Sequence, residues 1–377
     1  MRIVLDAVGG DHAPAAPVAG AVQAARTLGV EVVLVGPSEQ VRAELARHDT
    51  AGLTLSVVDA PEMIEMDEHP AQAIRRKKRS SIAVGMRLVR DGEADAFVSA
   101  GNSGAIMAGA IFVLGRIAGI ERPCLATVFP SLKGTITVAD VGANTDSKPE
   151  YLVQWARMTS LYAQLVQGIS RPRVALLANG EEDTKGDKLV QETHALLKVS
   201  DLNFVGNAEP KDALVNDIAD VIIADGFVGN LFIKGAEAVA KFAVKKIQRE
   251  LSDPGVAIRA LGGLAPLALL VATSKHKLRT LLAGLIGGPA LLGAVLAPAV
   301  VNMAKTLDYR AYGGAPLLGV NGVAIIAHGK SDPEAVANAI RRAKEMVERG
   351  LVAAIGGGEQ KTSEGTRNKE QEARAEG

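Results

Sequence analysis

Residues 2–14 read RIVLDAVGGDHAP, and this stretch decides the fold class. An apolar run ends at Asp6 and passes directly into two glycines, an acid, a histidine and a proline. A short apolar run bounded by turn residues is typical of a strand buried on both faces of a sheet. Glycine after such a strand lets backbone N–H groups approach a ligand closely. The stretch matches neither the G-x-G-x-x-G fingerprint nor the P-loop, so it predicts a strand-end site of another kind.

The same pattern of an apolar run ending in small or polar residues recurs along the chain. The predicted strands are 2–7, 30–36, 53–60, 94–101, 136–142, 173–180, 220–226 and 322–329, and one more starts near Cys124. The predicted helices are 14–28, closed by Gly29, a short one capped by Ser38, 70–91 and 104–115. Strands that alternate with helices predict an α/β fold with a mainly parallel sheet. We expect the strand ends to form a ligand crevice, although glycine, asparagine and aspartate are also ordinary turn residues.

Composition excludes several classes of protein. The 377 residues carry 42 Lys and Arg against 42 Asp and Glu, and this balance argues against broad binding of nucleic acid. The single cysteine, Cys124, allows no disulfide framework and no cysteine-based zinc site. No base is visible near Cys124, so we expect a buried structural thiol and a reducing cytoplasm. The first residues already form a strand, so no signal peptide is predicted.

Residues 254–305 depart from this pattern because they contain no acidic residue. Residues 280–304 carry no formal charge and reach the length of a membrane span, but glycines and prolines interrupt them. We expect an apolar helical hairpin, inserted at about 254–305, that dips into an anionic lipid surface. The residues expected to contact lipid are Leu281, Leu282, Leu285, Ile286, Lys275, Lys277 and Arg279. A buried dimer interface is the alternative.

Two further stretches are rich in charge. Five cations stand in a row at Arg75, Arg76, Lys77, Lys78 and Arg79. Such a run is usually a solvated surface, but it can also dock an acidic partner or face a phosphate. From Glu359 onward the only apolar residues are Ala373 and Ala375, and we expect a disordered tail over residues 355–377.

The stretch NGEEDTKGD, residues 179–187, is the richest in chemically active side chains. Lys185 can neutralise a phosphate or polarise a carbonyl oxygen, with the neighbouring acids setting its position, or the loop can be simply capped and solvated. His12 and His328 lie in strand-end turns and can move a proton near pH 7. Neither histidine stands in a metal-ligand spacing, and no G-x-S-x-G elbow supports a serine acyl-enzyme. No metal and no cofactor are predicted.

Taken together, these stretches closely resemble the bacterial phosphate acyltransferase family of phospholipid synthesis. The matching stretches are DAVGGDHAP (6–14), RRKKRSSIAVGMRLV (75–89), ADAFVSAGNSGAIMA (94–108), DVGANTDSKPEYLVQWA (140–156), NGEEDTKGD (179–187), DIADVIIADGFVGN (217–230) and DYRAYGGAPLLGVNGVAIIAHG (308–329). They run nearly end to end in family order, up to about Ala354. Ser103 stands where members often have Thr, which keeps a hydroxyl group, and Val8 stands where they often have Met. The 270–300 region is less basic here than is usual in the family.

The resemblance implies a reversible transfer of a fatty acyl group from the thioester of acyl carrier protein to inorganic phosphate. The implied fold is a three-layer α/β/α sandwich related to phosphotransacetylases and isocitrate-type dehydrogenases, formed here by one domain over residues 1–354. It also implies a homodimer in the cytoplasm that associates peripherally with the inner face of the membrane. There the acyl phosphate product passes to a membrane glycerol-phosphate acyltransferase.

Phosphate is itself a nucleophile, so the protein has to hold a dianion against a thioester and stabilise the oxyanion that develops. We expect Lys185, His12 and Asp11 to be catalytic. We expect phosphate to be held by Asn102, Ser103 and Gly104 at the start of an apolar helix, with Gly9 and Gly10 beside them. The further candidates for the crevice are Asp140, Asn144, Asn179, Glu182, Asp225, Asn230 and His328. The basic run 75–79 is assigned to docking of the acidic carrier protein.

Two other functions compete with this interpretation. A nicotinamide-dependent decarboxylating dehydrogenase would suit the fold, but no metal-binding aspartate cluster or adenosine pocket can be assembled from the sequence. A lipid-surface or carrier-binding module without catalysis would leave the polar strand ends without a purpose.

Overall fold

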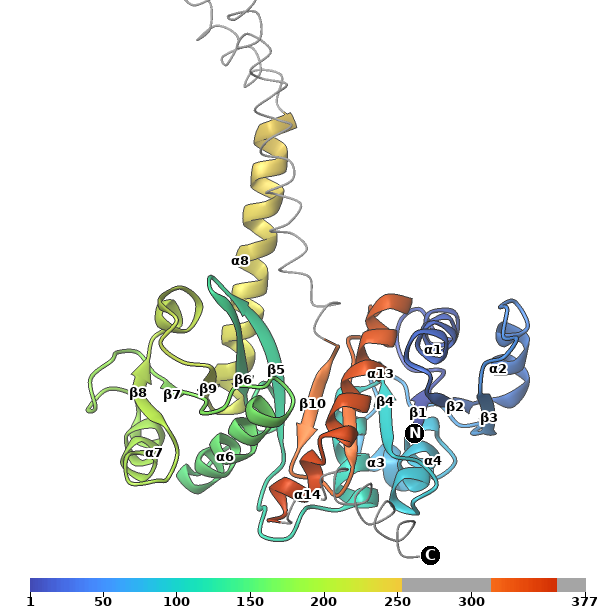
Figure 1. Ribbon diagram of the computed structural model, residues 1–377, viewed down its shortest axis with the longest axis horizontal. Helices are drawn as coiled ribbons and strands as arrows, with labels where there is room; N and C mark the ends of the chain where they lie inside the picture. Colours follow the sequence, from blue (N-terminus) through green and yellow to red (C-terminus); the bar gives the residue numbers. More distant parts are fainter. Residues whose placement is uncertain (253–312, 358–377) are drawn as a thin grey trace, which may run out of the picture. The chain divides into compact units, whose positions relative to one another are not determined.

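The computed structural model describes residues 1–252 and 313–357 (Figure 1). The chain divides into two compact units, one of residues Met1–Phe232 with Tyr309–Gly377 and the other of Ile233–Asp308. The predicted apolar hairpin, with all its expected lipid contacts, lies outside the described residues, as do residues 358–377 of the predicted tail. In the described ranges, no helix is both long and apolar enough to cross a bilayer.

One sheet of eleven strands runs through the first unit, in the order β3-β2-β1-β4-β11-β10-β5-β6-β9-β7-β8. The strands are β1 (Arg2–Asp6), β2 (Glu31–Gly36), β3 (Leu55–Asp59), β4 (Ala96–Ser99), β5 (Cys124–Ser131), β6 (Gly134–Ala139), β7 (Val174–Leu177), β8 (Phe204–Ala208), β9 (Val221–Ile223), β10 (Ala315–Leu318) and β11 (Val323–Ile326). The five strands from β3 to β11 are mutually parallel, and so are the four from β6 to β8. Between these blocks, β10 pairs antiparallel with β11 and β5, and β5 pairs antiparallel with β6.

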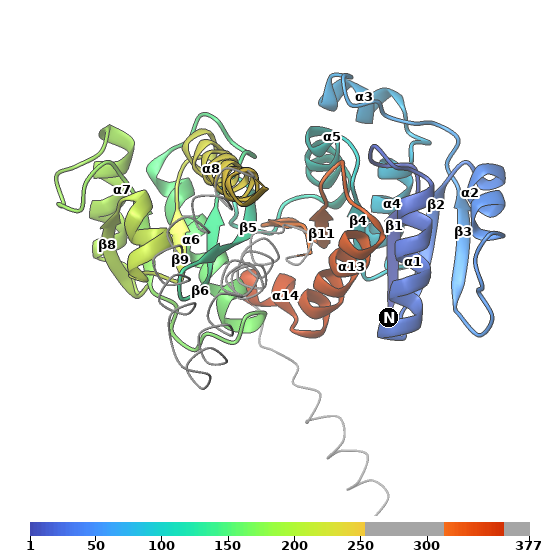
Figure 2. The same cartoon turned by 90° about the horizontal axis from the view of Figure 1, so that it is seen from above.

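Helices cover both faces of this sheet (Figure 2). The helical elements are α1 (Ala15–Leu28), α2 (Ser38–Leu45), α3 (Pro70–Arg76), α4 (Ser81–Arg90), α5 (Ser103–Gly109), the π-helix η1 (Ala110–Leu114), α6 (Pro149–Leu165), α7 (Lys188–Lys198), the π-helix η2 (Asp212–Asn216), α8 (Gly226–Ser252), α13 (Pro333–Glu348) and α14 (Leu351–Ile355). Helices α1 and α13 pack against one another on one face, and α4, α5 and η1 pack together on the other. The predicted three-layer α/β/α architecture is therefore confirmed.

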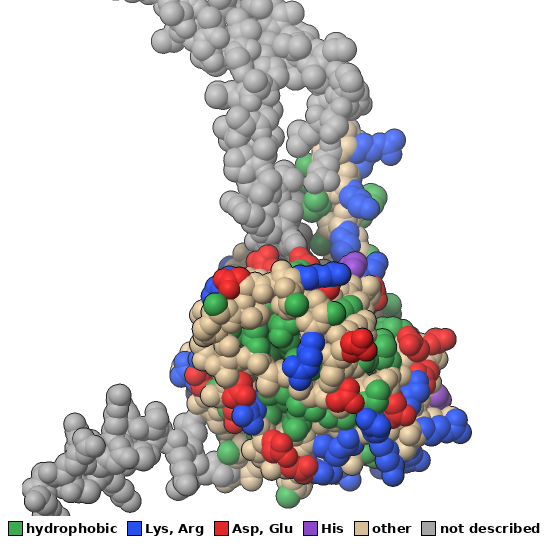
Figure 3. Space-filling model, turned by 90° about the vertical axis from the view of Figure 1, so that its right-hand side faces the viewer, with side chains coloured by type: hydrophobic (Ala, Val, Ile, Leu, Met, Phe, Trp, Pro, Cys, Tyr) green, Lys and Arg blue, Asp and Glu red, His purple; other side chains and the backbone are tan. Residues whose placement is uncertain are grey.

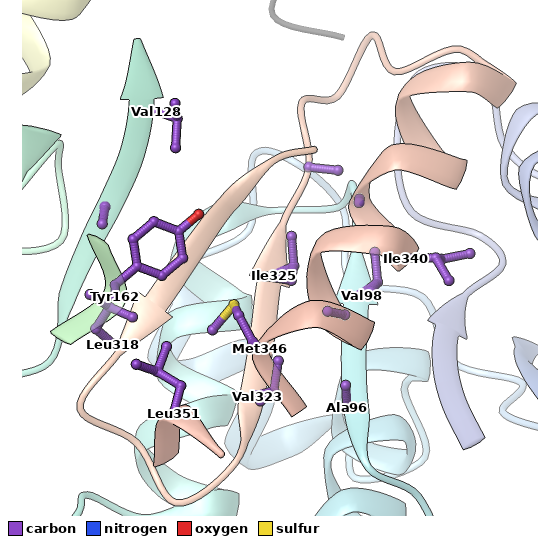
Figure 4. Close-up of a cluster of buried hydrophobic side chains, with 14 of the residues drawn as sticks. Ala96, Val98, Val128, Tyr162, Leu318, Val323, Ile325, Ile340, Met346 and Leu351 are labelled. Atoms are coloured by element: carbon purple, nitrogen blue, oxygen red, sulfur yellow. The ribbon is translucent and has the colours of Figure 1, made fainter. Parts of the chain in front are cut away.

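The two faces follow from the period of two in the strands. On β1, Ile3 and Leu5 belong to the apolar core beneath α1 and α13, whereas Val4 points into the second core. The central strand β4 does the same, with Val98 in the first core and Phe97 in the second. Figure 4 shows the first core, where side chains from β4, β5, β10 and β11 meet those of α6, α13 and α14. Alternate side chains of a strand point to opposite faces, and both faces are buried here. The strands are therefore nearly continuous runs of apolar residues, as the sequence suggested.

Three local predictions are corrected by the structure. The predicted helix 70–91 is two helices, because Ser80 interrupts it and caps α4 by accepting a hydrogen bond from the Ala83 N–H at 3.3 Å. The predicted helix 104–115 changes after Gly109 into the π-helix η1, whose last turn the Gly115 N–H closes on the Ala110 carbonyl at 3.0 Å. Ser38 is the first residue of α2 rather than its cap, and its N–H donates to Asp59. Strands β8 and β10 were not predicted.

Gly85 brings α4 against the sheet. A methyl group at this position would lie 2.4 Å from Phe97 Cε2 and 3.1 Å from Val4 Cγ1. We expect Gly85→Ala to lower the free energy of unfolding by about 1–3 kcal/mol, because both neighbours are fully buried and cannot move aside without strain. Urea denaturation followed by circular dichroism measures the change.

Gly235→Ala is the matched control, since a methyl group there meets no atom within 4 Å. In that variant, helix propensity predicts no loss of stability and a gain of up to about 1 kcal/mol. Equal stability of the two variants would contradict the tight packing at Gly85.

Candidate active site

The loops after β1, β4 and β11 lie together at one edge of the sheet. The Asp11 N–H donates to the Gly329 carbonyl at 2.7 Å, which joins the loop after β1 to the loop after β11. A side chain at Gly9 would lie 2.8 Å from the Gly101 nitrogen, so the loops after β1 and β4 touch where no Cβ fits. Gly10 has φ +101°, a conformation that glycine adopts without strain. The glycines of DAVGGDH are therefore required by close packing of neighbouring loops.

A buried carboxylate lies beneath these glycines. Asp6 is 2% exposed, and it accepts hydrogen bonds from the Val8 N–H at 3.1 Å and from the Ser99 hydroxyl at 2.7 Å. Ser99 in turn accepts from the Gly101 N–H at 3.0 Å. Burial raises the pKa of Asp6, and the hydrogen bonds from Ser99, Ser81 and the backbone oppose that rise. Asp6 thus fixes the loops after β1 and β4 from below.

Asn102 is the cap of α5, and both ends of its side-chain amide are engaged. Its carbonyl oxygen accepts from the Ala105 N–H at 3.0 Å, and its amide nitrogen donates to the carbonyl oxygens of Glu65 and Met66, each at 3.1 Å. Asn102 is buried, while the next residue, Ser103, is exposed. Asn102 therefore orients the start of α5 and holds the loop before α3, and the Ser103 hydroxyl stands open beside it.

The other predicted residues of this edge also face outward. Asp11, His12 and His328 are exposed, and Gly104 is half-buried against Pro70. The ring nitrogen Nδ1 of His328 accepts from the Lys330 N–H at 3.0 Å, which orients the imidazole. The loops after β1, β4 and β11 thus present the imidazoles of His12 and His328, the Ser103 hydroxyl and the first turn of α5. This helix continues without a break into η1.

A second buried carboxylate organises the loop after β6. The oxygen Oδ1 of Asp140 accepts from the N–H groups of Leu125 and Ala143, both at 3.0 Å. Its Oδ2 accepts from the Asn144 N–H at 2.7 Å and from the Asn144 amide at 2.9 Å. Burial raises the pKa of Asp140, and the bonds from Asn144, Ala143 and Leu125 lower it. Asp140 and Asn144 therefore shape this loop.

The loop after β6 carries the start of α8. The Gly226 N–H donates to the Asn144 carbonyl at 2.9 Å, and a methyl group on Gly229 would lie only 2.0 Å from the Asp140 carbonyl oxygen. Asp225 caps α8 by accepting from the Phe227 and Val228 N–H groups at 2.9 and 3.2 Å. Asn230, one turn into α8, is exposed, and its side chain lies close to Gly142.

The loop after β7 presents Lys185. Its backbone N–H donates to the Glu182 carbonyl at 3.0 Å, and its ammonium group lies 4.0 Å from Glu182 Oε1, with its side chain 47% exposed. Asn179 accepts from the Gly186 N–H at 2.9 Å, and a methyl group on Gly180 would lie 2.7 Å from Lys185 Cγ. Strands β6, β9 and β7 are parallel neighbours, so Asp140, Asp225 and Asn179 follow the same edge of the sheet.

Sequence reasoning missed the residues that support these loops from behind. Ser99 lies under Gly101, as described above. His194, 5% exposed on α7, donates from Nδ1 to the side-chain oxygen of Asn207 at 2.9 Å, and the Asn207 amide nitrogen donates to the Glu182 carbonyl at 2.8 Å. The other nitrogen of His194 lies 3.3 Å from Asp183. No motif marks His194 or Asn207, because each lies in a different element from the loop that it holds.

The basic run 75–79 does not act as one group. Lys77 pairs with Glu68 and donates to the Met63 carbonyl at 2.6 Å, and Arg79 lies 3.2 Å from Asp59. These two cations hold the loop between β3 and α4 in place. Arg75, Arg76 and Lys78 are exposed.

Among the described residues, one acidic cluster joins the loop after β7 to the segment after β8. The carboxylate oxygens of Glu181, Glu209 and Asp212 lie within 4.8 Å of one another. The Lys211 ammonium group lies 3.3 Å from Glu181 and 2.7 Å from Glu209, and these acids raise its pKa. A lysine thus already offsets the charge that a cation would neutralise there.

Comparison with known proteins adds to this geometry. Residues 1–277 and 267–354 match a family model described as a fatty acid synthesis protein. A phosphate acyltransferase of Herpetosiphon aurantiacus is 58% identical over 94% of this chain and 96% of its own. A phosphate acyltransferase of Desulfitobacterium hafniense is 44% identical over the same shares. The chain belongs to the phosphate acyltransferase family. The resemblance seen in the sequence is therefore confirmed, and this family member is an acyltransferase.

Solved structures support the fold alone. The EutD phosphotransacetylase of Staphylococcus aureus aligns with a TM-score of 0.57 at 17% identity, over 92% of this chain and 94% of its own. A phosphotransacetylase of Streptococcus pyogenes aligns with a TM-score of 0.56 at 16% identity, over the same shares. The predicted relation to phosphotransacetylases thus holds for the architecture.

The environment of Asp6 predicts how stability depends on pH. Its folded pKa is raised above the unfolded value, so the folded protein holds this proton to higher pH than the unfolded chain. We expect the unfolding free energy of the wild type to fall, relative to that of Asp6→Asn, as the pH rises from about 4 through the folded pKa. Urea denaturation of both proteins between pH 4 and 7 measures this difference in unfolding free energy. Because both proteins contain the other titrating groups, the contributions of those groups cancel. Parallel profiles would show that Asp6 is not held in its neutral form.

Proposed function

We propose that the enzyme transfers a fatty acyl group from the thioester of acyl carrier protein to inorganic phosphate, giving acyl phosphate and the free carrier thiol. Family membership supports acyl transfer that involves phosphate. The observation that carries the finer proposal is that two sets of strand-end loops present a lysine, imidazoles and a hydroxyl group, held by buried carboxylates, without a cysteine or serine elbow. Such groups suit a reaction whose nucleophile is the anion itself.

The reaction balances without an enzyme-bound intermediate. An oxygen of hydrogenphosphate forms a bond to the thioester carbonyl carbon, and the carbon–sulfur bond breaks. The proton of hydrogenphosphate ends on the departing sulfur. The protein therefore has to orient the dianion, stabilise the oxyanion and relay one proton.

Phosphate is assigned to the edge formed by the loops after β1 and β4. The exposed Ser103 hydroxyl and the first turn of α5 can donate to a phosphate oxygen, and the helix dipole favours negative charge there. Gly9 and Gly10 keep side chains out of the approach. Asn102 is given a positioning role, because its amide is already engaged. His12 and His328 are the candidates for the proton relay, and Asp11 ties their loops together.

Sheet twist supports a shared crevice for the two edges. Three antiparallel pairings separate the blocks, so β4 and β9 run in opposite senses through the ladder. Neighbouring strands also rotate by about 20–25°, which gives about 100–125° over the five pairs from β4 to β9. The carboxyl ends of the two strands then point only about 55–80° apart. Lys185, Asn144 and Asn230 are accordingly assigned to the side of the crevice that receives the thioester and its oxyanion.

The partners and location of the enzyme are also proposals. The cations near α3 and α4 favour an acidic carrier protein as a partner. The family resemblance favours a homodimer. The composition of residues 254–305 favours binding to an anionic membrane surface. Acyl phosphate formed at such a surface would pass to a membrane glycerol-phosphate acyltransferase.

Replacement of Lys185 tests the catalytic assignment. We expect Lys185→Ala to lower kcat by about 10²–10³-fold, because one preorganised donor to the oxyanion is lost. The measurement is phosphate-dependent release of thiol from acyl carrier protein. Lys188→Ala is the control, since that side chain is 88% exposed and pairs only loosely with Glu192 at 3.7 Å. Full turnover in Lys185→Ala would remove this residue from the mechanism.

Membrane association is tested by vesicle flotation. We expect Leu281→Glu with Leu285→Glu to release the enzyme from anionic vesicles, because each carboxylate resists burial among acyl chains. Val199→Glu, at an apolar position that is 83% exposed, serves as the control and should float as the wild type does. Unchanged flotation of the double variant would favour the buried-interface interpretation of residues 254–305.

A further inference from the structure

A basic groove lies away from the strand-end loops, between α3, α4 and η1, and has a volume of about 420 Å³. Four cations line it, namely Arg75, Lys78, Arg87 and Arg90. Figure 3 shows Lys and Arg side chains gathered at the lower right of the viewed face, in the part of the molecule where α3 and α4 lie. The groove takes only two cations from the basic run 75–79, and the other two come from α4.

The charge of this groove is largely uncompensated. Among the described residues, Arg90 is the only one of the four cations in an ion pair, with the adjacent Asp91 at 2.7 Å. The Arg87 guanidinium donates to the Lys78 carbonyl at 2.7 Å, which fixes its direction without neutralising it. By contrast, Lys77 and Arg79 in the same run are paired with carboxylates. Within the described ranges, Asp91 is thus the one carboxylate paired with these four cations, and the groove keeps a net positive charge.

An apolar surface accompanies this charge. Phe112 is 50% exposed on η1 and forms part of the wall, with the Arg75 guanidinium 4.8 Å above its ring. Its neighbours Ala110 and Leu114 on the same π-helix are buried. A partly exposed aromatic ring beside unpaired arginines is the composition found at the centre of protein interfaces.

The groove is also connected to the proposed phosphate site by a single helix. Helix α5 begins at Ser103 and continues into η1 at Ala110. Ser103 and Phe112 are nine residues apart, which corresponds to about 13 Å along a helix. A carrier protein that is bound at the groove would thus lie about 13 Å, along this helix, from a phosphate at the proposed site.

We propose that this groove docks an acidic, amphipathic helix of the acyl carrier protein, with its carboxylates on Arg75, Lys78, Arg87 and Arg90 and an apolar side chain against Phe112. This inference rests on the proposed function for the identity of the donor. The charge of the groove selects an anionic partner. Its concave shape suits one convex helix, whereas a lipid surface would present a flat array of headgroups to the protruding cations instead.

Binding of apo acyl carrier protein to the full chain, followed by fluorescence anisotropy at low salt, tests the docking without any reaction. We expect Arg75→Glu and Lys78→Glu each to weaken binding roughly 5- to 30-fold, because attraction becomes repulsion. Phe112→Ala should weaken it by a similar factor with little change in salt dependence. Arg76→Glu is the matched control: it is an exposed neighbour in the same run that does not line the groove, and it should bind as the wild type does.

Kinetics separate this inference from the proposed function. With an acyl carrier donor, the groove variants should raise KM for the donor and leave KM for phosphate unchanged. With an acyl thioester of a small thiol, they should match the wild type, which also shows that they fold. Equal effects of Arg75→Glu and Arg76→Glu, or loss of anionic vesicle binding with carrier affinity intact, would overturn the docking site. Absence of phosphate-dependent thiol release in the wild type, with anisotropy still sensitive to the groove, would overturn the proposed function alone.

Discussion

Two carboxylates buried at strand ends govern the candidate active site. Asp6 is the last residue of β1 and Asp140 follows β6, so each parallel block of the sheet has one of these groups at a strand end. Both carboxyl groups are buried, and each accepts hydrogen bonds from N–H or O–H groups around it. Moving either loop would leave a buried carboxyl group without its hydrogen-bond donors, which is costly. The need of Asp6 and Asp140 for hydrogen-bond donors therefore fixes the positions of the loops around them.

This constraint separates the supporting groups from the groups that can react. Asp6, Ser99, Asn102 and Asp140 are buried and fully engaged. His12, Ser103 and Lys185 are exposed above them. Sequence reasoning placed Asn102 and Asp140 among the groups that contact ligand, because residue type alone does not reveal which polar atoms are already bonded. The structure makes that distinction through the donors and acceptors of each side chain.

Much of the fold could be predicted because burial on both faces leaves a continuous apolar run in each central strand. The runs ending at Asp6, Ser99 and Ile223 are of this kind. Strand β10, with the sequence APLL, contains a proline and lies between Gly314 and Gly319, so it was not recognised and the antiparallel centre of the sheet was not foreseen. The π-helix η1 was missed for another reason: AIFVL is compatible with an ordinary helix, and tertiary packing decides the difference.

The helix formed by α5 and η1 holds Ser103, at the end of the loop after β4, at a fixed spacing from Phe112. At its start, Asn102 bonds to the Ala105 N–H and to two carbonyl oxygens of the preceding loop, so the first turn cannot slide along its axis. In its middle, Gly109 approaches Met86 so closely that a methyl group would lie 2.9 Å from the sulfur, which fixes the rotation of the helix against α4. A helix held at both points is a rigid spacer, because its length depends only on the number of residues. The number of residues between Ser103 and Phe112 thus sets their spacing, and the packing of α5 on α4 holds this helix in place. A partner bound at the ring would then be positioned with respect to a phosphate at the proposed site beside Ser103, without any movement of the enzyme.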